Sequence, residues 1–424
     1  MENETVTVNR EREEHVAGGG LLHRRAFLGM SAVAAGGLAS GLGAATDPRS
    51  PVSMREPGGA LSGYGTRAPS AETIQRIVPE LPFPGTGSSR TPLQLLEGTI
   101  TPNGLHFERH HNGVPAIDPA THELLIHGLV RQPLLFRYDD LLRYPRENRI
   151  LFIECSGNSG TIAAAAPVQA SAGQLNGLVS CAEWTGVRLG TLLDEVGVDL
   201  DARWVQAEGA DAAGMTRSIP LSICLDDAMI ALFQNGEPLR PEQGFPMRLL
   251  LPGIEGNASV KWLRRLKVIA TPALSREETS KYSDLLADGR AELFSLRMGV
   301  KSIILFPSFG LDLPGPGRRE ISGLAWSGHG RIRKVEVSAD GGTTWAEAAL
   351  GGSVLPKALT RFRIPWRWDG GPATLLSRAV DDTGAVQPRR KEWVAKYGIG
   401  QGYHSNAIQS WRIDESGHVS HVYA

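Results

Sequence analysis

Cysteine is scarce in this sequence. Cys155, Cys181 and Cys224 are the three cysteines among 424 residues. An odd number leaves at least one thiol outside any disulfide, and no Cys/His cluster has the spacing of a structural zinc site. A disulfide-stapled scaffold and a zinc module are therefore excluded. We interpret Cys181 and Cys224 as buried structural thiols, and a disulfide between them in an oxidising compartment is left open.

An excess of charge of one sign is also lacking. The formal net charge is -1, so neither a basic nucleic-acid footprint nor an acidic tail is indicated. Aromatic residues make up only 6%, whereas 50 Gly and 27 Pro favour many short strands and loops over a helical bundle. The length suffices for two hydrophobic cores, so we expect two folded domains.

A long apolar run is the third absence. The uncharged Ala/Gly-rich run at residues 29–46 is short and weakly hydrophobic for a membrane span. It follows residues 23–28 (His-Arg-Arg-Ala-Phe-Leu), which predict a twin-arginine export signal. We therefore expect a signal segment at residues 1–50, no membrane span and a periplasmic location, with an uncleaved anchor as the alternative. Residues 51–90, rich in Gly, Pro and Ser, predict an extended arm or linker.

A buried strand is predicted at residues 150–153 (Ile-Leu-Phe-Ile). The chain then breaks at Cys155 into Ser-Gly-Asn-Ser-Gly. A β-branched and aromatic run bounded by Gly, Asn and Ser is typical of a strand that ends in a tight loop. Small residues around Cys155 let a bulky ligand come close. The sequence thus predicts one thiol at the mouth of a sheet.

The first domain, placed at residues 91–290, carries further candidate binding residues. Arg109 stands among histidines, and its planar guanidinium suits an oxyanion or a phosphate; an ordinary surface loop is the alternative. Asp211 is either a turn residue or a carboxylate that faces a ligand. Apolar residues at 189, 192, 193 and 196 fall on one helical face, and Gly197 fits the helix C-cap.

Two more cations, Arg248 and Lys261, bracket a Gly-rich turn. Cations beside exposed backbone amides make a phosphate cradle. The alternative is a pair of structural ion pairs with Glu242 or Glu255. The sequence alone leaves both interpretations open.

The second domain, at residues 291–424, is predicted to be an immunoglobulin-like β-sandwich. Strands are predicted at residues 300–307, 321–326, 331–338 and 375–380. Short strands at regular spacing, separated by turns such as Asp-Gly-Gly at 340–342, are typical of such sandwiches. His404 and His421, near the C-terminus, are expected on the surface.

Six motifs in this chain resemble, in the same order, those of the sulfite oxidase family of molybdenum–pterin oxidoreductases. They are residues 107–115 (FERHHNGVP), 154–158 (ECSGN), 182–189 (AEWTGVRL), 209–211 (GAD), 244–248 (GFPMR) and 259–263 (SVKWL). The resemblance covers nearly the whole chain after the signal. It implies an α+β molybdenum cofactor domain followed by an immunoglobulin-like dimerisation domain, and hence a homodimer.

The resemblance also implies roles for particular residues. Cys155 would give its thiolate to molybdenum, because soft sulfur suits a metal already held by pterin sulfurs. Arg109 would face the open side of the metal, and Arg331 aligns with an arginine that reaches the substrate pocket, the alternative being a solvated strand-start arginine. The residues implied to bind the cofactor are Phe107, Glu108, Arg109, His110, His111, Cys155, Asp211, Arg248, Ser259, Val260 and Lys261.

The chain departs from the sulfite oxidase pattern at several positions. Ser159 and Gly160 stand where sulfite oxidases have arginines, and Gln243 stands where they have a histidine. Tyr282 lies near the family's active-site tyrosine but is misaligned with it, since that position falls near Asp288. Lost positive charge weakens the case for free sulfite and favours a larger, less charged substrate, such as a sulfane on a protein cysteine.

Within the family, the chain is similar to the molybdenum subunit of the sulfane dehydrogenase of the bacterial sulfur-oxidising (Sox) system. The sequence has no Cys-x-x-Cys-His haem motif, and no cytochrome b5-like domain precedes the molybdenum domain. We therefore expect no haem on this chain and a separate c-type cytochrome subunit as electron acceptor. The expected substrate is sulfur on a carrier protein. The alternatives are a sulfite:cytochrome c oxidoreductase and, from another class, an exported two-domain binding module without metal.

Overall fold

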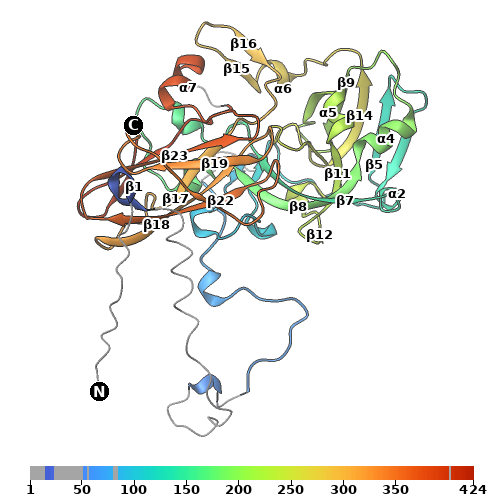
Figure 1. Ribbon diagram of the computed structural model, residues 1–424. Helices are drawn as coiled ribbons and strands as arrows, with labels where there is room; N and C mark the ends of the chain where they lie inside the picture. The colour runs from blue at the N-terminus through green and yellow to red at the C-terminus, as the bar shows by residue number, and fades with distance from the viewer. Residues whose placement is uncertain (1–14, 23–50, 55–56, 80–84, 401–402) are drawn as a thin grey trace, which may run out of the picture.

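The computed structural model describes residues 15–22, 51–54, 57–79, 85–400 and 403–424 (Figure 1). The twin-arginine motif at residues 23–28 lies outside the described residues, as does most of the predicted signal segment. Within the described ranges, no helix is long and apolar enough to cross a membrane.

One sheet of the first domain is mixed and has an alternating pattern of burial. Its strands run in the order β10 (Thr216–Pro220), β9 (Trp204–Gly209), β14 (Leu263–Ile269), β5 (Glu123–Gly128) and β6 (Leu134–Arg137). β14 is parallel to β5 and antiparallel to β9. Leu124, Ile126 and Val205 are fully buried while their neighbours along each strand are not. This period of two turns one face of the sheet to the core.

The other sheet of the first domain carries the Cys155 loop. It runs β12 (Glu237–Pro238), β11 (Met229–Gln234), β8 (Val179–Arg188) and β7 (Glu147–Glu154), and β13 (Arg248–Leu250) also pairs with β11. The strand predicted at residues 150–153 is confirmed within β7, and Cys155 follows directly. Both sheets contribute to one core, and a smaller core beside it joins Phe107 and Trp184 to the surroundings of Cys155.

The predicted amphipathic helix is α4 (Leu189–Val196). Its four apolar residues are fully buried, and Gly197 ends it with a φ of 68°. The other α-helices of the described residues are α2 (Tyr138–Leu141), α3 (Ala172–Asn176), α5 (Leu221–Asp226), α6 (Arg276–Thr279) and α7 (Arg390–Tyr397). The hairpin of β15 (Ser283–Leu285) and β16 (Ala291–Leu293) lies at the edge of the first domain (Figure 1).

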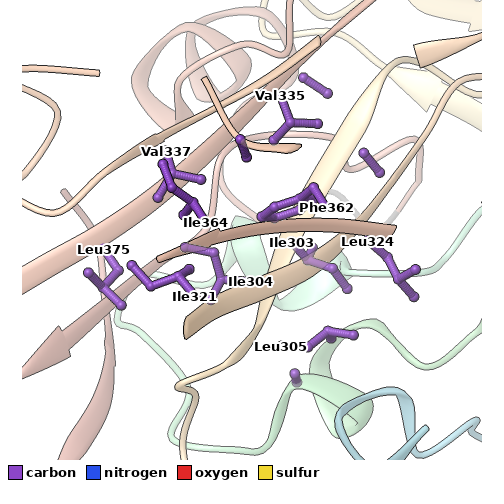
Figure 2. Close-up of a cluster of buried hydrophobic side chains, with 14 of the residues drawn as sticks. Ile303, Ile304, Leu305, Ile321, Leu324, Val335, Val337, Phe362, Ile364 and Leu375 are labelled. Atoms are coloured by element: carbon purple, nitrogen blue, oxygen red, sulfur yellow. The ribbon is translucent and has the colours of Figure 1, made fainter. Parts of the chain in front are cut away.

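Two antiparallel sheets face each other in the C-terminal domain. One runs β1 (His15–Ala17), β2 (Leu21–Leu22), β22 (Thr360–Trp368), β18 (Gly317–Trp326) and β17 (Lys301–Phe306), with β21 (Ala349–Gly351) also on β22. The other runs β20 (Ala346–Glu347), β19 (Ile332–Ser338), β23 (Ala373–Asp381), β24 (Ser410–Ile413) and β25 (Val419–Val422). Figure 2 shows the shared core, in which Val335, Val337 and Leu375 meet Phe362 and Ile364. The four predicted strands are confirmed, and the immunoglobulin-type arrangement stays a prediction.

Two segments set aside from the sequence contribute strands. Leu21 on β2 is fully buried and pairs with Trp366, whose indole Nε1 donates to Gly19 O at 2.5 Å. β3 (Gly87–Ser89), at the end of the predicted arm, pairs with β4 (Glu108–His110). The assignment of residues 1–50 to a signal and of residues 51–90 to an arm stays a prediction, and Gly- and Ser-rich composition did not reveal this pairing with distant strands. Most side chains at residues 57–79 are exposed, and this stretch loops away from both domains in Figure 1.

Candidate active site

A pocket lies beside the Cys155 loop. Segments that are far apart in the sequence line it, and ten of the residues implied by the family resemblance are among them. The lining consists of His106, Phe107, Arg109, His110, His111, Ile153, Cys155, Asp211, Met215, Gln243, Arg248, Gly256, Asn257, Ser259, Val260, Lys261, Trp262 and Tyr282. The fold therefore brings the predicted cofactor residues together around one thiol.

Backbone hydrogen bonds hold the thiol at the end of β7. Cys155 N donates to Leu178 O, and Asn158 N donates to Cys155 O, each at 2.9 Å. Cys155 is half-buried and free, and so are the deeply buried Cys181 and Cys224, so the disulfide left open by the sequence does not form. Burial raises the pKa of Cys181 to about 12. Cys155 is thus the one thiol of the chain that faces a pocket.

Strand β4 contributes two consecutive residues to the pocket lining. Arg109 and His110 line it, whereas Glu108 does not and instead accepts a hydrogen bond from His110 Nε2 at 2.8 Å. Lys261 Nζ lies 2.7 Å from His110 Nδ1. Burial, with the charges of Lys261 and Arg109, lowers the pKa of His110 to about 3, so the imidazole is neutral at pH 7. Glu108 therefore acts on the pocket through His110.

Arg248 is buried without a carboxylate partner. Its Nη1 donates to Gln243 O at 3.1 Å and its Nη2 to Ser259 O at 2.9 Å, while its buried Nε has no partner among the described residues. Burial lowers the pKa of Arg248 to about 9. The free Nε and the missing counter-charge make this guanidinium a receptor for an anionic group.

Lys261, like Arg248, has no carboxylate at ion-pair distance among the described residues. Its ammonium donates to the backbone oxygen of Glu242 at 3.0 Å rather than to a carboxylate. Glu255, the other candidate partner, pairs instead with Arg217 at 2.8 Å. Burial and the charge of Arg248 hold the pKa of Lys261 well below its ordinary value. Among the described residues, the structural ion pairs considered for Arg248 and Lys261 do not form, which leaves the phosphate-cradle interpretation.

Asp211 combines the two roles considered for it. Its Oδ1 accepts from Met215 N at 3.2 Å and its carbonyl accepts from Gly214 N at 2.9 Å, as in a turn. The residue also lines the pocket. The turn fixes the carboxylate in a position from which it can meet a bound ligand.

The pocket wall also contains Tyr282, next to the residue that follows β4. Its hydroxyl lies 2.9 Å from His111 Nε2, and its ring packs against that of Tyr403 at 5.5 Å. Burial raises the pKa of Tyr282, whereas burial and the charge of Arg109 lower that of His111 to about 4. Both groups are therefore uncharged at pH 7. Sequence alignment left the role of this tyrosine open, because the loop that carries it differs from the family pattern.

The surface placement of two histidines is corrected, whereas the substrate-pocket role of Arg331 stays a prediction. Arg331 is exposed and precedes β19, its carbonyl accepts from Asp382 N at 2.9 Å, and it is not among the pocket-lining residues. His421 is fully buried and the His404 side chain is only 10% exposed, so neither lies on the open surface. His404 N donates to Ser156 O at 2.9 Å, and His421 is enclosed as β25 packs back on β24. A position near the C-terminus does not predict exposure, because the chain can fold back onto the domain there.

The donor set fits a metal that brings most of its own ligands. Among the described residues, no group of three or more His, Cys, Asp or Glu side chains could hold a metal ion. Cys155 offers one soft sulfur, and Arg109, Arg248 and Lys261 offer positive charge without carboxylates at ion-pair distance in the described part of the chain. A metal carried on an anionic, sulfur-bearing organic cofactor matches this combination.

Comparisons with known proteins agree with that chemistry. Residues 111–277 match the family model of the oxidoreductase molybdopterin binding domain, and residues 294–411 match that of the Mo-co oxidoreductase dimerisation domain. Sulfite oxidase of Gallus gallus is 32% identical over 340 residues, which cover 74% of this chain and 72% of that protein. The chain belongs to the sulfite oxidase family. These matches support a molybdenum–pterin cofactor and a dimer-forming C-terminal domain.

Two other members of the sulfite oxidase family are informative. The mitochondrial sulfite oxidase of Mus musculus is 33% identical over 339 residues, which cover 74% of this chain but only 61% of the mouse protein. The crystal structure of the sulfane dehydrogenase SoxCD from Paracoccus pantotrophus superimposes with a TM-score of 0.86 and 43% identity. That match covers 89% of this chain and 98% of the SoxCD chain.

Proposed function

We propose that this chain is the molybdenum subunit of a sulfane dehydrogenase. The observation that carries the proposal is the pocket-facing thiol of Cys155, which shares its pocket with three cations that have no carboxylate at ion-pair distance among the described residues. The likeness to SoxCD over nearly all of that chain favours sulfane sulfur as substrate. The bound cofactor would supply the two-electron redox chemistry, and the protein binds, orients and shields the reacting groups.

Each part of the pocket has a separate role in this proposal. Cys155 would hold the metal through its thiolate, since metal binding would compensate for the burial that raises the pKa of the thiol. Arg248 and Lys261 would neutralise the anionic groups of the pterin. Arg109 orients the substrate, and the uncharged pair of His111 and Tyr282 can pass a hydrogen bond to it without adding charge.

The charge around the thiol favours a sulfane over free sulfite. Ser159, where sulfite oxidases have an arginine, is 5% exposed and its hydroxyl is bonded inside the protein. No cation therefore follows Cys155 into the pocket from this position. Apolar Ile153, Met215 and Val260 instead form part of the lining. A pocket with fewer cations discriminates less strongly in favour of a small dianion.

The partners and the location complete the proposal. We infer a periplasmic enzyme, exported by the twin-arginine signal at residues 23–28, that passes electrons to a c-type cytochrome subunit. Its sulfur substrate is carried on the cysteine of a carrier protein. Two copies associate through the C-terminal domain. The two sheets of that domain have an immunoglobulin-like arrangement.

A sulfite:cytochrome c oxidoreductase is the second candidate. The similarity to chicken and mouse sulfite oxidases and the presence of Arg109 in the pocket favour it. The rate of cytochrome c reduction should therefore be measured with three substrates: sulfite, thiosulfate, and thiosulfate plus a thiol carrier protein. Turnover that requires the carrier supports the sulfane dehydrogenase, whereas faster turnover with free sulfite supports the second candidate.

Elemental analysis tests the cofactor independently of the substrate. We expect about one molybdenum per purified chain. Cys155→Ser should fold with the same thermal midpoint within about 2 °C, because the residue is half-buried and the change is small, yet lose activity. Cys181→Ser is the matched control at a buried thiol. A wild-type protein free of molybdenum would instead identify a binding module.

A further inference from the structure

The carboxylate next to Cys155 is held by the C-terminal domain. Glu154 is 1% exposed, and its Oε1 accepts a hydrogen bond from Lys301 Nζ at 2.9 Å. Its Oε2 accepts from Trp326 Nε1 at 2.6 Å. Lys301 begins β17, Trp326 ends β18, and the two residues are paired across these strands. Two paired strand residues of the C-terminal domain thus hydrogen-bond to the residue that precedes the thiol.

The same ammonium also reaches the far side of the Cys155 loop. Lys301 Nζ donates to Ser159 Oγ at 2.6 Å, and Ser159 Oγ donates to Asn176 Oδ1 at 2.5 Å. Within the loop, Asn158 Nδ2 donates to Glu154 Oε1 at 2.9 Å. Lys301 therefore ties together the residues on either side of the loop that presents Cys155.

The backbone at Ser159 shows that the loop is held in place. Its φ is 61°, in the left-handed region that a residue with a side chain rarely adopts. Such a conformation persists where the surroundings determine it. The two hydrogen bonds of the Ser159 hydroxyl, to Lys301 and Asn176, are those surroundings.

Stability alone does not account for the charges. Around the network, Phe152 and Val179 of the first domain share one apolar core with Ile303 and Trp326 of the second. Apolar residues of matching size often stabilise such a place as well as an ion pair does, because charges lose hydration on burial. A directional network of ammonium, carboxylate, indole and hydroxyl adds what apolar packing lacks, namely a fixed orientation.

We propose that Lys301 is a positioning residue that fixes the Cys155 loop against the cofactor, so that the C-terminal domain forms part of the support of the active site. The proposal rests on the proposed function, since it assumes that Cys155 is the metal ligand. Where sulfite oxidases have an arginine after the motif, this chain has Ser159, and a cation from a strand 142 residues away occupies the adjoining space. That cation is turned toward Glu154 rather than into the pocket.

The test compares Lys301→Met with Lys334→Met in the holoenzyme. Lys334 forms a partly exposed ion pair with Glu336 at 3.2 Å in the same domain and serves as the control. We expect Lys301→Met to lower kcat per bound molybdenum by about 10–100-fold, as loss of groups that orient metal ligands does, with KM little changed. The thiolate-to-molybdenum absorption band of the oxidised enzyme should shift, and Lys334→Met should leave both readouts unchanged.

Two further variants separate positioning from folding. Lys301→Met combined with Glu154→Gln leaves no lone buried charge, so it should regain thermal stability but keep the shifted absorption band. Ser159→Ala removes both hydrogen bonds of the hydroxyl, preserves the ion pair of Lys301 with Glu154 and should shift the band in the same direction by a smaller amount. It also decides the question if the charge variants do not fold.

A wild-type band and a wild-type kcat per molybdenum in the folded variants, with only a lower thermal midpoint, would overturn the positioning role. Failure of the proposed function looks different. In that case the wild-type protein itself would lack molybdenum, or Cys155→Ser would keep the absorption band. The wild-type and Cys155→Ser measurements therefore distinguish the two failures.

Discussion

Removal of the buried guanidinium of Arg217 should destabilise the first domain strongly. Arg217 is fully buried, and its Nη2 lies 2.8 Å from Glu255 Oε1. Its Nε lies 3.9 Å from Glu278 Oε1, and both carboxylates are themselves nearly inaccessible. Arg217→Met fills a similar volume but leaves two buried carboxylates without their shared cation.

The magnitude follows from the burial of all three groups. Loss of one partner from a buried ion pair costs about 3–5 kcal/mol. At about 2–4 °C per kcal/mol for a domain of this size, the thermal midpoint should fall by about 6–20 °C. The guanidinium also lies 5.2 Å from the ring centre of Tyr282, so the pocket wall loses support at the same time.

Scanning calorimetry of the wild-type protein and three variants measures this effect. Arg290→Met is the control, because Arg290 is 80% exposed and pairs with Asp288 at 2.7 Å; its loss should cost less than about 1 kcal/mol. Arg217→Met with Glu255→Gln should recover part of the loss, since one of the two unpaired charges is gone. If Arg217→Met lowers the midpoint no more than Arg290→Met does, the reasoning from buried charge is wrong.

Three further predictions concern groups around the pocket. Burial opposes protonation of His404, but its hydrogen bond to Glu255 and the charge of that carboxylate outweigh burial and raise the pKa above 6.5, so the pair stabilises the fold fully below that pH and the contribution fades as pH rises through the raised value. The difference in thermal midpoint between wild type and His404→Gln should accordingly shrink as the pH rises above about 6.5, and an unchanged difference would contradict this. Tyr282→Phe removes the hydrogen bond to His111 and should cost about 1 kcal/mol of stability and lower kcat, which steady-state assays and thermal melts together will show. Arg331→Gln should leave kcat and KM at wild-type values, because the side chain is exposed outside the pocket lining, and a raised KM would restore the predicted role in substrate binding.

The sequence predicted those strands and helices whose burial pattern and end residues lie within one short stretch of the chain. The apolar run at residues 150–153 and its Gly/Ser boundary predicted β7 and the loop of Cys155, because adjacent residues determine both the buried strand and the turn that ends it. The face of α4 and the glycine that ends it were visible for the same reason. The assembly of Arg109, Arg248 and Lys261 was different, since only the family motifs indicated that these distant segments meet.

Contacts across long sequence separations accounted for the rest. The pairing of β3 with β4 and the burial of His404 and His421 depend on partners that no local window contains. The ion pair of Lys301 with Glu154 could not be predicted from the sequence either, because a lysine at the start of an apolar strand does not indicate that a carboxylate 147 residues earlier is its partner. A charge inside an apolar pattern was the one available signal.

The short hairpin at residues 15–22 has a consequence for maturation of the chain. Leu21 lies on the outer edge of β22, beside Trp366, and β21 covers only residues 361–363 of that edge. Cleavage after the predicted signal would remove the hairpin and leave the end of β22 with unpaired backbone groups. An uncovered strand edge readily accepts another strand. The precursor would therefore carry a built-in cover on the domain that matches a dimerisation module, and processing would decide when that edge becomes open to association.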